Sequence, residues 1–327
     1  MFKKLYFPFV LTLELIILVS FILFLIYLFP SLDPQGYQYY GDAYHVPFVE
    51  QELSNTLVII VRWLLYLMTA GMLLPMMATI IMEIIRWQIN QVKNPSNVSG
   101  ARTRNDGEQV VRFDTHLKLQ HYLIMIGVTL AGILGLTQAV PDWPIANWFV
   151  EQTLGGIEVK RQFHHYFAYI ADFTVFYYIG YILHKFIIKK EKPKAMLFTL
   201  KDLKDFISMN LYLIGTNKEE PEYDRYSFGQ KIDFTLIVLG IPSLSVTGLV
   251  MYYTGFFNLF IPDVGIALAA ILHRSVAIFL FWFVLSVHMY YAHLEPRAFP
   301  VNTVILTGKM SKSLYQEMYP LDRERLG

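Results

Sequence analysis

The chain has 327 residues, of which 55% are hydrophobic, 16% aromatic and 16% charged, and its formal net charge is +1. This composition excludes a soluble globular domain and gives no basis for a nucleic-acid partner, and the absence of cysteine excludes disulfides, iron–sulfur clusters and thioether-attached haem. We therefore predict a multi-pass protein of the cell's inner (cytoplasmic) membrane, with membrane lipid as its surroundings.

Six apolar runs each reach the roughly 20 residues that a helix needs to cross a bilayer. Basic residues gather before the first run, between the second and third, and after the fourth, whereas the loop at 30–53 carries only acidic charges. By the positive-inside rule, both termini are predicted to be cytoplasmic. The predicted fold class is all-α integral membrane, with spans at about 5–29, 54–86, 119–140, 163–187, 231–255 and 271–292.

Composition also suggests how the spans are grouped. Residues 1–93 form a two-helix N-terminal membrane unit, and residues 94–111, which contain the stretch "NPSNVSGARTRNDGE", have the composition of a linker. Residues 112–327 then form a four-helix unit with a cytoplasmic tail. Within that unit, the basic segment between the fourth and fifth spans predicts a short interfacial helix around "MLFTLKDLKDFI".

Histidines near the ends of three spans are placed at matching depths. Fifteen residues of α-helix rise about 22 Å and end on nearly the same face, so His273 and His288 occupy opposite ends of the last span. His121 begins the third span level with His288, while His164 or His165 begins the fourth level with His273. One histidine pair in each leaflet is what two bis-histidine b haems require. A two-histidine zinc site without carboxylate or thiolate ligands fits poorly.

Five basic residues lie where the carboxylates of such haems would be. A buried propionate needs a cation or hydrogen bonds to remain charged. Lys160, Arg161 and Arg274 lie level with the outer histidines, and Arg112 and Lys118 lie beside the inner ones. Contact with lipid headgroups explains these positions nearly as well.

Several other ionisable residues lie within or beside the spans. In regular α-helices His184 and His293 point away from the predicted haem column, so they are either quinone or proton-site residues or interfacial histidines. Asp172 either carries protons or is a neutral carboxyl bonded to a tyrosine. We expect Glu14 and Arg62 to form a charge pair between the first two spans, because either charge alone in lipid costs several kcal/mol.

Four stretches together resemble the core helices of the dihaem cytochrome b subunits that anchor respiratory formate dehydrogenases and hydrogenases. They are "RFDTHLKLQHYLIMIGVTLAGILGL", "GGIEVKRQFHHYFA", "SFGQKIDFTLIVLGIPSLSVTGLVMYY" and "ILHRSVAIFLFWFVLSVHMYYAHLEPRAFP". The tail, ending in "YPLDRERL", resembles a branch associated with multihaem c-type cytochromes. The resemblance covers residues 112–327 and implies that His121, His164, His273 and His288 are the haem ligands.

These observations predict a function. We expect two bis-histidine b haems to carry electrons between an extracytoplasmic redox subunit, holding iron–sulfur clusters or multihaem cytochrome c, and a quinone near the cytoplasmic side. The chain would then be the quinone-reactive cytochrome b subunit of a multisubunit respiratory oxidoreductase. Three alternatives remain: a proton or ion transporter, a structural membrane anchor without haem, and a haem conduit with no quinone site.

Overall fold

The structure, a computed structural model, describes residues 2–28, 52–93, 108–140, 143–190, 196–297, 299 and 302–322. The loop predicted at 30–53 and most of the linker predicted at 94–111 lie outside these residues. The described chain is almost wholly helical, which confirms the all-α prediction. Its six helices long and apolar enough to cross a membrane cover Leu5–Tyr27, Thr56–Lys93, Thr115–Thr137, Ile157–Ile187, Phe228–Tyr252 and Asp263–Leu294.

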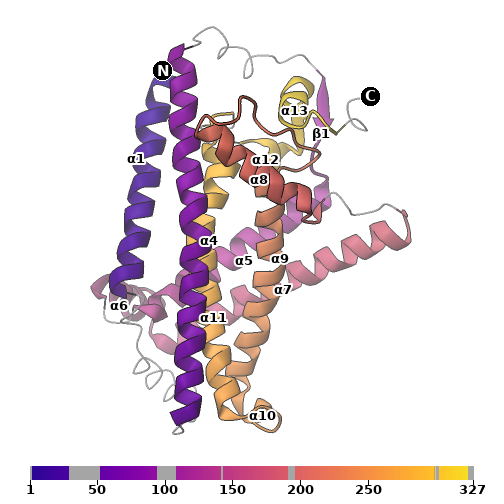
Figure 1. Ribbon diagram of the computed structural model, residues 1–327. Helices are drawn as coiled ribbons and strands as arrows, with labels where there is room; N and C mark the ends of the chain where they lie inside the picture. The colour runs from indigo at the N-terminus through magenta and orange to yellow at the C-terminus, as the bar shows by residue number, and fades with distance from the viewer. Residues whose placement is uncertain are drawn as a thin grey trace.

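The two N-terminal helices pack directly against the last long helix. α1 (Phe2–Leu23) continues into one π-helical turn, η1 (Phe24–Leu28), and lies beside α4 (Glu52–Lys93) (Figure 1). Apolar residues of α1 recur every three or four positions and form one buried stripe. The resulting core joins Tyr6, Val10, Ile17 and Phe21 to Leu73, Met77, Ile80 and Ile84 of α4 and to Phe283, Val287 and Tyr290 further along the chain.

The remaining spans form two antiparallel pairs. α5 (Thr115–Ala139) packs along α7 (Ile157–Ile187), and α9 (Phe228–Tyr252) packs along α11 (Asp263–Phe283). The first pair crosses the second obliquely (Figure 1). Side-chain caps begin two of these helices: Asp114 accepts a hydrogen bond from the backbone N–H of Leu117 (2.9 Å), and Ser227 forms a capping box with Gln230.

α11 does not continue as a regular α-helix. It passes into two π-helical turns, η5 (Val284–His288) and η6 (Tyr290–Leu294), where backbone hydrogen bonds span five residues, as from the N–H of Glu295 to the carbonyl of Tyr290 (2.8 Å). A π-turn holds more residues than an α-turn and therefore rotates every later side chain about the helix axis. This rotation changes which residues share a face with His288.

Short elements close the two ends of the bundle. α6 (Pro144–Trp148) and η3 (Phe149–Leu154) connect α5 to α7, and α10 (Thr254–Phe257) connects α9 to α11. At the other end, β1 (Gln109–Val111) pairs antiparallel with β2 (Lys309–Ser311), with Val110 opposite Met310. No strand was predicted from the sequence. The tail also forms α12 (Val304–Thr307) and α13 (Lys312–Met318).

A short helix, α8 (Leu200–Leu213), lies where the sequence predicted one. Its buried face contacts α4 and α9, and Lys231 of α9 forms an ion pair with Asp202 (2.9 Å). The start of α1, α8 and α13 lie at the same end of the bundle, which we call the amino-terminal end, and α10 lies at the opposite end (Figure 1). The membrane side that each end occupies stays a prediction.

Candidate functional site

The four predicted ligand histidines form two facing pairs. The ring centroids of His121 on α5 and His288 on η5 lie 6.3 Å apart, with 29° between the ring planes. The ring centroids of His164 on α7 and His273 on α11 are also 6.3 Å apart, with 67° between the planes. We call these the inner and outer pairs; the inner pair is the one nearer the amino-terminal end.

Hydrogen bonds to Nδ1 orient three of the four rings. His164 is bonded to the carbonyl of Ala131 (2.9 Å), and His273 to the carbonyl of Leu244 (3.0 Å). Nδ1 of His288 lies 2.6 Å from a carboxylate oxygen of Asp233 on α9. A donor at Nδ1 leaves the lone pair of the ring on Nε2, and such an outer partner is typical of metal-binding histidines.

Asp233 was not singled out from the sequence. It lies in a span that contains no histidine, and only the packing of α9 against η5 brings it to His288. The one available signal was a lone carboxylate in an otherwise apolar run, which is expensive unless it has a partner.

The outer pair also depends on two glycines. A Cβ built on Gly135 would lie 3.4 Å from Cε1 of His164, and one on Gly248 would lie 3.2 Å from Cε1 of His273. Gly135 lies four residues after Ala131, and Gly248 lies four residues after Leu244. The carbonyls of Ala131 and Leu244 are the ones that His164 and His273 contact. Each imidazole therefore packs over a helix turn where a side chain is missing.

The two pairs fit a metal held between opposing imidazoles. Bonds from a metal to imidazole nitrogen are about 2 Å long, so two rings that share one metal have centroids about 6 Å apart. The observed 6.3 Å in both pairs agrees with this. Among the described residues, no group of three or more histidine or acidic residues could hold a metal, so a two-histidine centre with the remaining positions supplied by a macrocycle fits best.

From the sequence, either His164 or His165 could belong to the outer pair. The structure distinguishes between them. His164 faces His273, whereas the ring of His165 packs edge-on against Tyr252 of α9, 4.5 Å between centroids. His116 is bonded instead to the hydroxyl of Tyr177 (2.7 Å). The geometry therefore favours His164 for the outer pair.

The predicted basic residues differ in their surroundings. Lys160 is 1% exposed, lies one turn before His164 and is within electrostatic range of it. Arg161 forms an ion pair with Glu158 (2.5 Å), and Arg274 is partly buried next to His273. The stem of Lys118, one turn before His121, lies against Gly308.

Arg112 makes contacts that differ from the predicted one. It is 2% exposed, and its guanidinium carbon lies over the rings of Tyr319 (4.2 Å) and Tyr226 (4.5 Å). It also donates to the hydroxyl of Tyr315 (3.4 Å). These contacts join the start of α5 to the tail and favour a structural role for Arg112.

The π-helical turns move His293 from its expected position. Five residues separate it from His288, which is about one π-turn, so both histidines lie on nearly the same face. His293 is within electrostatic range of His288 and His121. An ideal α-helix would have pointed it away, and no sequence pattern predicted the π-turns.

Three other predictions have different outcomes. His184 is exposed near the end of α7, where no described hydrogen bond or ring contact joins it to either pair. Asp172 accepts a hydrogen bond from Ser245 of α9 rather than from a tyrosine. The predicted ion pair between Glu14 and Arg62 is wrong: both carboxylate oxygens of Glu14 are buried without a hydrogen-bond partner among the described residues.

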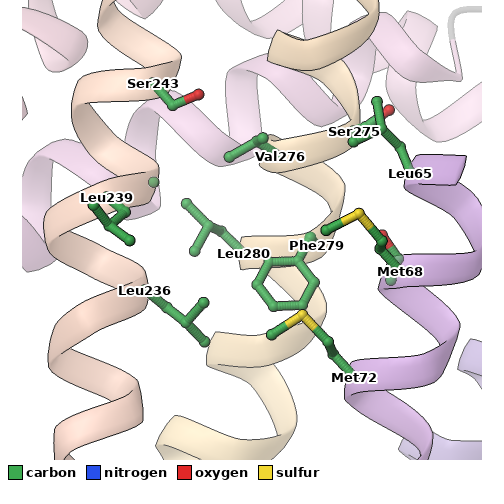
Figure 2. A pocket seen from close by; sticks show the side chains of 12 residues that line it. Leu65, Met68, Met72, Leu236, Leu239, Ser243, Ser275, Val276, Phe279 and Leu280 are labelled. Atoms are coloured by element: carbon green, nitrogen blue, oxygen red, sulfur yellow. The ribbon is translucent and has the colours of Figure 1, made fainter. Parts of the chain in front are cut away.

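An apolar cleft of about 250 Å³ lies between α4, α9 and α11. Figure 2 shows Met68 and Met72 of α4, Leu236 of α9 and Phe279 of α11 around it. Its described lining contains hydroxyls, such as that of Ser243, but no titratable side chain. The cleft suits a hydrocarbon chain and lacks the groups that proton transfer to a head group requires.

Membrane helices that hold facing imidazole pairs define the class of membrane cytochromes. The family described as "Prokaryotic cytochrome b561" matches residues 112–303, more than half of the chain, and the chain belongs to this family. It is thus a multi-pass inner-membrane protein that binds haem b and transfers electrons.

Curated relatives match the chain over a similar length. The chain is 26% identical over 188 residues to the "Formate dehydrogenase, cytochrome b556(fdo) subunit" of Escherichia coli (strain K12), covering 57% of this chain and 79% of the relative. It is 26% identical over 187 residues to the "Formate dehydrogenase, cytochrome b556 subunit" of Haemophilus influenzae, covering 56% and 71%. The resemblance inferred from the sequence is thereby confirmed, and α1 and α4 lie outside the matched region.

Proposed function

We propose that the chain is the membrane subunit of a respiratory oxidoreductase and binds two b haems, one between His121 and His288 and one between His164 and His273. The observation that carries this proposal is that the two ring centroids are 6.3 Å apart in each pair. The four histidines come from three different membrane-spanning helices. The haems supply the one-electron chemistry, and the chain supplies ligation, spacing and electrostatics. The likeness to formate dehydrogenase cytochrome b subunits supports a multisubunit complex.

The two sites differ in what surrounds them. His288 contacts the carboxylate of Asp233, whereas both outer histidines contact neutral carbonyls. A carboxylate makes its imidazole a more basic ligand and stabilises positive charge nearby. The haem at the inner site is therefore expected to have a lower midpoint reduction potential than the haem at the outer site. Lys160, Arg161 and Arg274 are the candidates to hold the outer propionates, and Lys118 is the candidate at the inner site.

We place the exchangeable quinone near the inner pair, at the end of the bundle predicted to be cytoplasmic. His293 supports this location, because it is close to both inner histidines and an imidazole can exchange a proton with a quinone. The apolar cleft, in contrast, can take only a hydrocarbon tail. An iron–sulfur or multihaem cytochrome c subunit would exchange electrons with the outer pair at the opposite face. The chain then carries electrons between that partner and quinone in either direction.

The test uses the purified full chain in proteoliposomes. Its haems are reduced chemically, the excess reductant is removed, and a short-chain naphthoquinone is added while the visible spectrum is followed. We expect rapid reoxidation in the wild type and slower reoxidation in His293→Phe with unchanged haem content. Haems that quinone does not oxidise would favour the conduit without a quinone site. A protein without haem absorption would favour a transporter or an anchor.

A further inference from the structure

A buried cluster of ionisable side chains lies where Glu83 of α4 meets η6, the helical turn that follows His288. Glu83 of α4 is 9% exposed, and its Oε2 accepts a hydrogen bond from the hydroxyl of Tyr291 (3.4 Å). Tyr291 follows His288 by three residues, a rise of less than about 5 Å along the helix. Glu83 is thus joined by one side chain to the helix turn that carries an inner ligand.

The cluster continues to solvent at the amino-terminal end. Glu295 is 6% exposed and accepts a hydrogen bond from Nε of Arg297 (2.5 Å). The same guanidinium lies 3.5 Å from a carboxylate oxygen of Glu220, whose side chain is 38% exposed. Glu83 interacts electrostatically with all three of these residues. Carboxyl groups therefore extend from the surface to the hydroxyl of Tyr291, three residues after His288.

The buried carboxyls of this cluster outnumber the cation that contacts them. Glu83 and Glu295 are both buried, and Arg297, which is bonded to Glu295, also contacts the part-exposed Glu220, so complete ionisation would bury negative charge that this guanidinium only partly offsets. Such charges are expensive to bury, and one carboxyl remains protonated instead.

Two buried tyrosines lie beside Glu83. Tyr6 of α1 and Tyr290 of η6 are 2% and 0% exposed and lie near each other and near Glu83, but neither hydroxyl makes a well-formed hydrogen bond among the described residues. The titratable groups that interact with the cluster are Tyr6 of α1, Tyr290 and Tyr291 of η6, Tyr223 of the segment before α9 and Tyr319 of the tail, and Glu14 of α1 interacts with Tyr6.

We propose that Glu83 and Glu295 exchange protons between the aqueous phase at the amino-terminal end and the quinone at the inner pair. The inference rests on the proposed function and adds its proton route. Reduction of one quinone to quinol takes two electrons from the haems and two protons, which Glu83 delivers one at a time. After each delivery Glu83 is reprotonated through Glu295 and Glu220, and quinol oxidation reverses every step. Glu83 lies outside the region that matches the family.

The experiment compares Glu83→Gln, Glu295→Gln and Glu83→Asp with the wild type in the same proteoliposomes. Glutamine keeps the shape of Glu83 and its acceptor for Tyr291 but cannot release a proton. Glu219→Gln removes an exposed carboxyl next to Glu220 and is the matched control. Three quantities are measured for each variant: haem content, the rate of reoxidation by naphthoquinone, and the infrared absorption of protonated carboxyl groups.

We expect Glu83→Gln to slow reoxidation at least tenfold and to lose one protonated-carboxyl band, with haem content and chemical reduction unchanged. Glu83→Asp should recover part of the rate, which a purely structural role would not predict. A wild-type rate in Glu83→Gln with the band retained would overturn the inference and leave the quinone site standing. Wild-type haems that quinone does not oxidise would overturn the proposed function, and the inference with it.

Discussion

Gly248 of α9 lies directly against the imidazole of His273, and a Cβ there would come within 3.2 Å of Cε1. The ring also reaches the carbonyl of Leu244, one turn earlier on the same helix. The position of His273 therefore depends on a missing side chain as well as on a hydrogen bond.

Gly248→Ala should weaken the outer haem site. The added methyl group pushes the ring away from its carbonyl partner, and loss of an outer-shell contact of this kind typically costs about tenfold or more in metal affinity. Titration of haem into the apoprotein measures the loss. Gly180→Ala is the control, because a Cβ at Gly180 meets nothing within 4 Å. Equal haem affinity in the two variants would show that the ring tolerates the contact.

Asp233→Asn should act on the inner site alone. The substitution removes a negative charge beside His288, which makes the ligand less basic and favours the reduced, less positive iron. We expect the inner midpoint potential to rise and the affinity for the inner haem to fall by about tenfold. A spectroelectrochemical titration resolves the two haems. A shift of the outer potential instead would contradict the placement of Asp233.

Much of this site follows from the sequence, and for identifiable reasons. Helix rise and rotation, which are nearly constant in regular helices, put His273 and His288 at opposite ends of one span. The predicted topology then put His121 level with His288, and His164 or His165 level with His273. The position of His293 could not be predicted in the same way, since π-turns alter the rotation without a sequence signal. Asp233 and Glu83 each depend on contacts between helices that are distant in the chain.

The wrong prediction for Glu14 has a similar cause. Glu14 lies about 18 Å from the start of α1, whereas Arg62 is only ten residues into α4, a helix of 42 residues that begins at the other end of the bundle. Their depths could not be compared without knowing how far α4 extends beyond α1. Arg62 instead lies over the ring of Trp63, 5.9 Å from its centroid.

Glu14→Leu should stabilise the protein. The carboxyl is 1% exposed among apolar side chains and has no hydrogen-bond partner among the described residues, so leucine removes a buried polar group at similar volume. We expect the free energy of unfolding to rise by about 1 kcal/mol or more. Thermal unfolding in detergent, followed by tryptophan fluorescence, measures the change. A lower melting temperature would mean that the carboxyl has a stabilising partner.

Docking of α8 should weaken in acid. Burial raises the pKa of Asp202, but hydrogen bonds from Lys231 and Thr199 outweigh burial and hold that pKa below its ordinary value. A carboxyl with a lowered pKa contributes stability above its unfolded pKa of about 3.9, and the contribution is lost as pH falls through the folded value. The protection of the α8 amide hydrogens, taken relative to their intrinsic exchange rates at each pH, should therefore fall below about pH 4.

In the Asp202→Asn variant, the amide hydrogens of α8 should exchange fast already at neutral pH. The substitution leaves Lys231 buried without its counter-charge. If α8 in this variant exchanges as slowly as in the wild type at pH 7, the ion pair does not hold the helix.

The most direct test of the two-pair assignment is haem quantitation by pyridine haemochrome, with reduced-minus-oxidised spectra, for the wild type and the four single alanine variants of the histidines. We predict two b haems per wild-type chain. His121→Ala and His288→Ala should lose the same spectral component, and His164→Ala and His273→Ala the other, while His165→Ala keeps both. Losses that do not group in these pairs, or a wild-type chain with a single haem, would contradict the assignment.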